Sequence, residues 1–307
     1  MNDITKQLLS LISDFDPETG FAGAFNIRED TGCAGRQNSQ NIEITSKADK
    51  PGIDIRVKPG TKGETVYIPA CVTHSKVDDL VYNDFYIGAG ADVVVVAGCG
   101  VHTDGEESSQ HTGIHRFYLE PGARVLYREK HIGTGEGGGQ RIINPQTYVE
   151  LQKDSYLEMD TTQIKGVDST QRLTTGVVGP RARLVVREKL MTHGDQYAET
   201  NFEVDLNGED SGADLISRSV AKGRSKQLFR SRINGNVRCT GHSACDAIIM
   251  EEGTVSAIPE LTANDLDAAL IHEAAIGKIA GEQLTKLMTL GLTAEEAEAK
   301  IIEGFLK

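Results

Sequence analysis

The chain has 307 residues, of which 38% are hydrophobic and 33 are glycine, and it contains no tryptophan. This is enough apolar matter for a sizeable core of valine, isoleucine and leucine, which excludes a disordered chain. Acidic residues outnumber basic ones by 45 to 32, and the net charge of -13 has the wrong sign for a general nucleic-acid binder.

The five cysteines are spread along the chain without a dense spacing pattern. They predict free thiols in a reducing compartment rather than a disulfide framework, so we expect a cytoplasmic protein. The first residues, MNDITKQLLSLISDF, lack a basic start followed by an apolar run. No stretch approaches the roughly 18 apolar residues of a membrane helix, so neither secretion nor membrane insertion is expected.

The first segment predicts a short amphipathic helix that ends before the turn at Asp16-Pro17. Such a helix is too short to stand alone. Residues 1–41 are therefore expected to form a helix and a lead-in to the next region. The apolar residues at helical spacing are Ile4, Leu8, Leu9 and Ile12.

Residues 42–271 have a different pattern, in which short β-branched and alternating runs are punctuated by glycine, asparagine and proline. A unit of strand, polar turn and strand recurs, as in FYLEPGARVLYREK and GVVGPRARLVVREK. Small residues at comparable places in the units are spaced irregularly, as in a degenerate repeat of about 30 residues. These residues are Ala91, Ala123, Ser155, Ala182, Ala213, Ala244 and Ala268.

Units of this kind cannot bury both faces alone, so successive copies are expected to stack as a β-helix or a similar β-solenoid. A β-sandwich is the alternative, because paired strands with polar turns also occur there. The favoured prediction is a mainly β protein with a β-helix core, preceded by a short helix.

Residues 272–307 predict a C-terminal helical domain. Apolar residues recur at three- and four-residue steps in GEQLTKLMTLGL and in TAEEAEAKIIEGFLK. Gly291 fits a helix stop between these segments, and Thr293 followed by Glu296 predicts a capping box. The apolar stripes of the two helices either pack within the protein or form a docking surface for a partner.

A formal G-x-G-x-x-G occurs at Gly133, Gly135 and Gly138. A dinucleotide fingerprint needs this loop to open a helix, but Arg141 leads into IINPQTYVEL, which has the composition of a strand. No Lys-Ser or Lys-Thr follows the glycines, so a P-loop is absent as well. The segment is interpreted as a turn between stacked strands, and ATP would be bound by another chain.

A first candidate site is the segment GCGVHTDGEESSQHTGIHRF, which contains Cys99, His102, His111 and His115. Thiolate and imidazole groups are ligands for zinc or iron. The segment lacks the paired cysteines of a structural zinc finger, and its acidic residues fit an exposed polar loop. Both interpretations stay open at this point.

A second candidate site lies near the end of the β region. Cys239, His242 and Cys245 precede His272 and Glu273 by about 30 residues, which is close to one repeat. Stacking would place the two groups on adjacent turns. A thiolate can accept sulfur, and imidazole and carboxylate can coordinate iron. The alternative is a small buried cysteine and a structural His-Glu pair.

From this segment onward the sequence resembles the SufB/SufD-type components of the SUF iron-sulfur cluster assembly system. The resemblance rests on CDAIIM, SAIPEL, HEAAIGKI, EQL, LMTLGLT and EEAEAKIIEGF, in that order, and is strongest from Arg232 to Phe305. It implies a right-handed β-helix core. It also implies a C-terminal helical domain that binds SufC, an ABC-type ATPase.

The resemblance also implies roles for individual residues. Cys245 matches the cysteine that accepts sulfur in SufB, Glu273 matches a glutamate that helps to build the nascent cluster, and His272 matches the neighbouring histidine. All three would ligate iron. Cys239 and the group Cys99, His102, His111 and His115 match no known role and are kept as possible further ligands.

The sequence thus predicts a cytoplasmic scaffold rather than an enzyme, on which an iron-sulfur cluster of the 4Fe-4S or 2Fe-2S type is built. The expected partners are a SufC-like ATPase, a second copy of the chain in a homodimer, a sulfur donor and apo-protein acceptors. One rival is a metalloenzyme that uses the Cys99 to His115 group. The other is a carbohydrate-active β-helix enzyme, which the absence of tryptophan disfavours.

Overall fold

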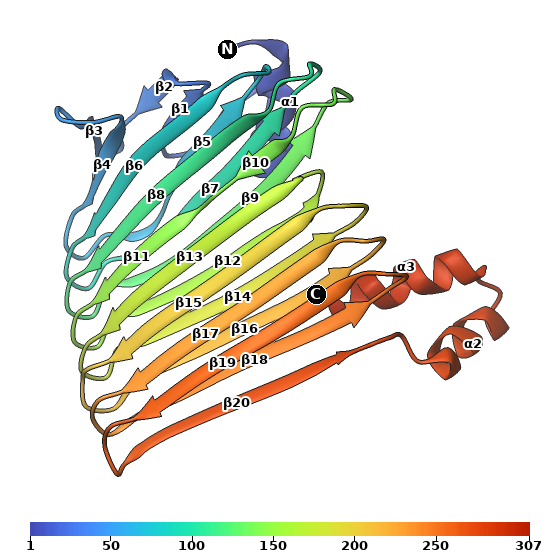
Figure 1. Ribbon diagram of the computed structural model, residues 1–307. Coiled ribbons are helices and arrows are strands. Elements are labelled where there is room, and N and C mark those ends of the chain that lie inside the picture. Colours follow the sequence, from blue (N-terminus) through green and yellow to red (C-terminus); the bar gives the residue numbers. More distant parts are fainter.

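The computed structural model describes residues 1–307 and consists of two stacked sheets with helices at both ends (Figure 1). The chain alternates between the sheets, so each turn adds one strand to each of them. The first sheet contains β1 (Ala24–Glu29), β2 (Gly32–Gln37), β5 (Lys62–Val72), β7 (Asp92–His102), β9 (Arg124–Thr134), β12 (Tyr156–Lys165), β14 (Arg183–Thr192), β16 (Ser211–Ala221), β18 (Cys239–Ile249) and β20 (Ala268–Gly277).

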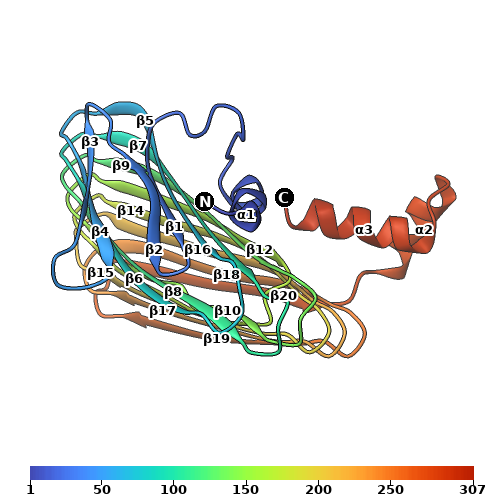
Figure 2. The ribbon, with the colours of Figure 1, turned by 90° about the horizontal axis from the view of Figure 1, so that it is seen from above.

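The second sheet faces the first across a shared interior (Figure 2). It contains β3 (Ile42–Ser46), β4 (Gly52–Val57), β6 (Asp78–Ile87), β8 (Ser109–Leu119), β10 (Arg141–Ile143), β11 (Gln146–Leu151), β13 (Ser169–Val178), β15 (Tyr197–Leu206), β17 (Lys226–Gly235) and β19 (Thr254–Ala263). The helices are α1 (Asp3–Ile12), α2 (Gly281–Thr289) and α3 (Ala294–Phe305).

The strands form a β-solenoid of about eight turns, which confirms the stacked arrangement. Strands pair in parallel throughout the stack, and only the hairpins β1–β2 and β3–β4 pair antiparallel. This rules out the β-sandwich, whose sheets are antiparallel. The interior is a core of aliphatic and aromatic side chains from both sheets. Because equivalent residues of successive turns are in register, each inward side chain lies next to its equivalent in the turn before.

The register corrects the repeat alignment at two places. Ala91, Ala123, Ser155 and Ala182 each precede the first paired residue of a strand in the first sheet, as expected. In the next two turns Ser211 and Cys239 occupy this place, whereas Ala213 pairs with Leu184 and Ala244 lies in the middle of β18. The position is buried at the bend into the strand, where a small side chain fits, and serine and cysteine meet that requirement as alanine does.

The residue before this bend has a left-handed backbone in successive turns. Gly90 and Gly122 have φ of 65° and 68°, and Asp154, Arg181 and Asp210 adopt the same conformation in the following turns. Glycine adopts this region without strain, and aspartate tolerates it better than most residues. The turn geometry is therefore kept along the stack while its sequence changes.

Helix α1 forms as predicted and packs on the outer face of β7. Leu8, Leu9 and Ile12 are buried, and a Cβ atom on Gly98 would lie only 2.5 Å from the carbonyl oxygen of Ile12. A glycine at position 98 therefore permits this close approach. The two hairpins lie at the N-terminal end of the solenoid, and α1 lies beside that end on the outer side of the first sheet (Figure 2).

Helices α2 and α3 follow β20 and project to one side of the solenoid (Figure 1). The predicted capping box is present at Thr293 and Glu296. Phe305 and Leu306 pack against Val220 and Ile248 of the solenoid, so the apolar stripe of α3 is used within the protein. Strand β20 runs to Gly277, past residue 271, so His272 and Glu273 belong to the last turn of the stack. None of the three helices has the length and apolar content needed to cross a membrane.

Side chains of β16 alternate between the core and the solvent, which predicts that two substitutions on this strand change the free energy of unfolding by very different amounts. Leu215 is fully buried in the main core, whereas Arg218 on the same strand is exposed and has no ion-pair partner. Leu215→Ala should lower the free energy of unfolding by about 2–5 kcal/mol because it leaves a cavity. Arg218→Ala should change it by less than about 0.5 kcal/mol. Urea unfolding followed by circular dichroism measures both, and equal effects would contradict the inward direction of Leu215.

Candidate functional site

Strand β18 divides the predicted site residues between the two faces of the first sheet. Cys239 and Cys245 belong to the main core, and Ser243 Oγ lies 2.7 Å from Ser231 Oγ of the facing sheet, so these residues point inward. His242 points outward, where its Nδ1 lies 2.7 Å from Asp214 Oδ1. The period of two along a strand thus separates His242 from both cysteines.

Cys245 lies at the end of a column of polar inward residues. Its neighbour in the previous turn is Ser217, whose neighbour is Glu188. Ser217 Oγ donates a hydrogen bond of 2.7 Å to Glu188 Oε2. Burial, together with the negative charges of Glu188 and Asp246, raises the pKa of the Cys245 thiol to about 12. In this conformation Cys245 is a protonated thiol and a weak nucleophile.

Strand β20 brings His272 to the same side as Cys245, but not Glu273. His272 pairs with the inward Ser243, whereas Glu273 pairs with Ala244, which points outward. The direct neighbour of Cys245 is Ala274, so His272 lies diagonally from the thiol on the inner face. Nδ1 of His272 is buried and has no hydrogen-bond partner. Within one chain the structure therefore joins Cys245 with His272 and leaves Glu273 on the opposite face.

The last turn has no covering element on its far side (Figure 1). Strands β19 and β20 are the final members of their sheets, so each has one edge without a neighbouring strand. Their residues are mostly exposed, with Ile258 48% and Ile271 57% accessible. His272 and Glu273 thus lie on the terminal strand at this open end, and Cys245 lies one turn further in.

Cys239 is a core residue of the same strand. It occupies the bend position described above and is buried, and burial raises its pKa. Its neighbours in the adjacent turns are Ser211 and Ala268, both small residues. The geometry gives Cys239 a packing role.

The Cys99 to His115 group lies at the other end of the solenoid and is only partly brought together. Cys99, His111 and His115 line one cavity of about 240 Å³ near the N-terminal end. His102 lies outside it, with its ring bonded to Thr134 Oγ1 and Asp104 Oδ2. No group of three or more His, Cys, Asp or Glu side chains anywhere in the chain is arranged to hold a metal ion.

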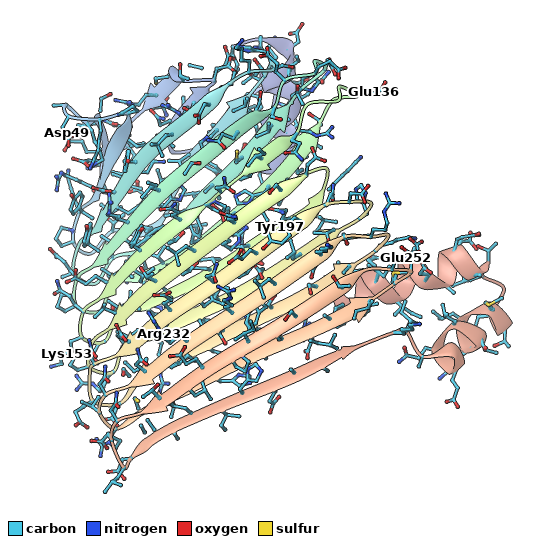
Figure 3. All side chains as sticks on the ribbon, in the orientation of Figure 1. Asp49, Glu136, Lys153, Tyr197, Arg232 and Glu252 are labelled. Carbon is cyan, nitrogen blue, oxygen red and sulfur yellow. The ribbon has the colours of Figure 1, made fainter.

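The glycine-rich segment forms the turn that the sequence predicted. It connects β9 to β10, and no helix follows it. Glu136, labelled in Figure 3, lies in this loop, at the end of the strands opposite Lys153. Gly137 and Gly139 approach the loop of the preceding turn so closely that a Cβ atom on either would clash with its backbone.

A buried charge network in the middle of the solenoid was not predicted. Arg172, from the second sheet, donates to Glu129 Oε2 at 2.8 Å and lies 3.1 Å from Glu188 Oε1. Burial alone would raise the pKa of Glu129, but His131 and Arg172 outweigh it and hold that pKa well below its usual range. The sequence does contain a pattern that could have predicted this network. Arg-Glu-Lys ends both FYLEPGARVLYREK and GVVGPRARLVVREK, and it places Glu129 and Glu188 at the same inward position of the repeat.

Comparisons with known proteins assign most of the chain to one family. Residues 81–305 match the family model described as SUF system FeS cluster assembly, SufBD core domain. An iron-sulfur cluster assembly SufBD family protein of Methanothermobacter thermautotrophicus is 30% identical over 262 residues, which are 83% of this chain and 62% of the relative. A family member of Archaeoglobus fulgidus is 29% identical over 271 residues, 86% of this chain and 71% of the relative.

The chain therefore spans about 62% of the length of the first of these relatives. The family match covers the stack from β6 onward together with both C-terminal helices, and it includes Cys245, His272 and Glu273. The chain belongs to the SufBD family of iron-sulfur cluster assembly proteins.

Proposed function

We propose that this protein is a scaffold on which iron and sulfur are assembled into a cluster that is then passed on. The observation that carries the proposal is the placement of Cys245 and His272 on one inner face near the C-terminal end of the solenoid, where β19 and β20 each have one free edge. The family takes part in iron-sulfur cluster assembly. The cluster is cargo here, and the chain performs no turnover of a small molecule.

Sulfur would arrive on Cys245 by exchange with a donor persulfide. The Cys245 thiolate attacks the terminal sulfur of the donor, the new bond joins the two sulfurs, and the donor cysteine leaves as a thiolate. No net oxidation occurs, but the thiol must first lose its proton. Its burial and its raised pKa oppose that step in the closed solenoid. The proposed function therefore requires the last turn to open.

The ligand set of one chain is incomplete in the closed conformation. Cys245 and His272 face inward and Glu273 faces outward. Clusters of the 4Fe-4S and 2Fe-2S types are usually held by four thiolates, so a cluster with one cysteine per chain would be labile. A second copy of the chain, paired through the free edges of β19 and β20, would supply further ligands, with Glu273 entering when β20 moves.

Helices α2 and α3 are the proposed docking site of a SufC-like ABC ATPase. On α2, Met288 is 46% exposed and Leu290, at its end, is 75% exposed. Helix α3 is anchored to the solenoid by packing on Ile248 of β18 and by an ion pair between Glu298 and Lys222. Ile248 lies on the strand that carries Cys245. A partner that moves α3 during its ATP cycle would therefore pull on the site strand.

Anaerobic reconstitution with iron and sulfide tests the role of Cys245. The wild-type chain should develop sulfur-to-iron charge-transfer absorption, and Cys245→Ser should lose most of it because a hydroxyl is a poor ligand for cluster iron. Cys239→Ser is the matched control, since Cys239 lies on the same strand in a packing role. An equal spectrum from the wild type and Cys245→Ser would remove Cys245 from the ligand set.

Alkylation with iodoacetamide tests the closed state of the thiol. Cys33 is exposed and should react within the native chain, whereas Cys245 should react only after unfolding in urea. Because the rate follows the thiolate fraction, any native labelling of Cys245 should rise about tenfold per pH unit below its pKa. Peptide mass analysis reports each site separately. Similar rates for Cys33 and Cys245 near pH 8 would contradict the buried, protonated thiol.

Native mass measurement after co-expression with a SufC-like ATPase tests both partner proposals. We expect two copies of the chain and two of the ATPase. Met288→Glu should release the ATPase and leave the pair of chains intact, because it puts a charge on the proposed docking surface. Gln283→Glu adds the same charge at another exposed position of α2 and serves as the control. A complex that contains a second, different SufB/SufD-type chain would overturn the homodimer.

A further inference from the structure

The cavity at the N-terminal end of the solenoid is lined by positively charged side chains that the proposed function does not use. It has a volume of about 240 Å³, and residues of both sheets line it. Its lining includes the exposed Cys33 and Ser46 as well as the buried Ala97 and His111, so the cavity extends from the surface into the interior. A space of this size can hold several waters or a small ligand.

Four cationic side chains line this cavity, whereas the carboxylates that pair with them do not. Arg28 Nε donates to Asp79 Oδ2 at 2.8 Å. Lys47 Nζ donates to Asp84 Oδ2 at 2.8 Å and also to Asp54. All three carboxylates lie outside the lining, so the positive member of each pair is the one that borders the space. The four cations are Arg28, Arg36, Lys47 and Lys50.

Arg28 and Lys47 keep unused N–H donors although their side chains are only 13% and 6% exposed. Asp79 accepts from Nε and Nη2 of Arg28, and no hydrogen bond joins Nη1 to the protein. Burial lowers the pKa of Lys47, but its bonds to Asp54 and Asp84 outweigh this effect and raise that pKa, so the ammonium group stays charged. It has three N–H donors, of which two are used. Buried donors are satisfied in native proteins, so these donors require an acceptor in the cavity.

Arg36 is half-buried on the edge strand β2 and forms no ion pair with a carboxylate. Its Nε donates to Asn26 Oδ1 at 2.8 Å, and Asn26 is only 7% exposed, so this contact orients the guanidinium group at the cavity. The two terminal nitrogens of Arg36 make no hydrogen bond to the protein. A guanidinium group oriented in this way presents a planar fork of donors, which matches two oxygens of a carboxylate or a phosphate.

The deep end of the cavity carries no unpaired negative charge. His115 Nε2 lies 3.3 Å from Asn83 Nδ2, and burial lowers the pKa of His115 to about 4, so its ring is neutral near pH 7. Glu129 is the one acidic residue of the lining, and Arg172 donates to its Oε2 at 2.8 Å. An anion near the four cations would therefore face no free carboxylate inside the cavity.

We propose that this cavity binds a small dianion with oxygen acceptors, of the class of phosphate or a short dicarboxylate. Arg36 holds two of its oxygens, and Nη1 of Arg28 and the third N–H of Lys47 supply further donors. Lys50 adds positive charge, since its nearest carboxylate, that of Asp49, is 3.9 Å away. All four cations precede residue 81, where the family match begins, and lie at the opposite end of the stack from Cys245. The site is therefore independent of the proposed cluster assembly.

Isothermal titration of the full chain with inorganic phosphate and with succinate, at constant ionic strength in chloride, tests the proposal. At least one of the two anions should bind at one site per chain, and the tighter one identifies the ligand group. Arg36→Gln should weaken that binding about 10- to 100-fold, because charge-assisted hydrogen bonds are lost. Arg218→Gln is the matched control, since it removes the same charge from an exposed arginine on β16, and it should bind like the wild type.

Alkylation of Cys33 gives a second measurement, because this exposed thiol belongs to the cavity lining. The bound anion should slow the reaction of Cys33 with iodoacetate in the wild type and not in Arg36→Gln, and constant ionic strength excludes simple screening as the cause. Lys50→Gln, in the turn between β3 and β4, is a second variant that should also weaken binding, and circular dichroism checks the fold of both. No binding of either anion by the wild type, or wild-type affinity in every variant that folds, overturns the proposal.

Discussion

Parallel stacking in register is the constraint on which this structure depends. An inward side chain lies against its equivalent in the turns before and after it, so a charged residue placed inside cannot turn out to solvent. It must find its counter-charge across the interior. Arg172 does this for two glutamates of the opposite sheet, Glu129 and Glu188, which lie two turns apart with Thr161 between them. A buried charge left without its partner would cost about 3–5 kcal/mol, so the three residues form a unit.

The same column links the charge network to the proposed sulfur acceptor. Glu188 Oε2 accepts a hydrogen bond from Ser217 Oγ, and Ser217 pairs with Cys245 of the next turn. Burial, to which the negative charge of Glu188 adds, raises the pKa of the Cys245 thiol and keeps it protonated. Closed stacking protects Cys245 from unspecific reaction, and its use as a nucleophile depends on disturbing that stacking.

The stacked fold, the first helix and the capped last helix could be predicted, because each depends on a local pattern of apolar spacing or capping residues. The directions of the site residues could not. Whether Glu273 shares a face with Cys245 depends on which residues of β18 and β20 pair, and that register depends on the lengths of β19 and of the two turns that connect it to β18 and β20. The prediction that Ala213 and Ala244 are equivalent positions of the repeat was wrong for a related reason. Ser211 and Cys239 occupy the bend position instead, and they are as small as alanine requires, so residue type alone did not identify this position.

The two ends of the solenoid differ in which elements adjoin their terminal strands. At the N-terminal end, the hairpins β1–β2 and β3–β4 complete the two sheets, and α1 packs on the outer face of the first sheet beside them. At the C-terminal end no strand pairs with the outer edge of β19 or β20, so the inward residues of the last turn have a neighbouring strand on one side only. His272, which pairs with Ser243 in this last turn, has its Nδ1 buried without a hydrogen-bond partner. An unfinished stack can accept another strand or open, and exchangeable cargo belongs at such an end rather than in the closed interior.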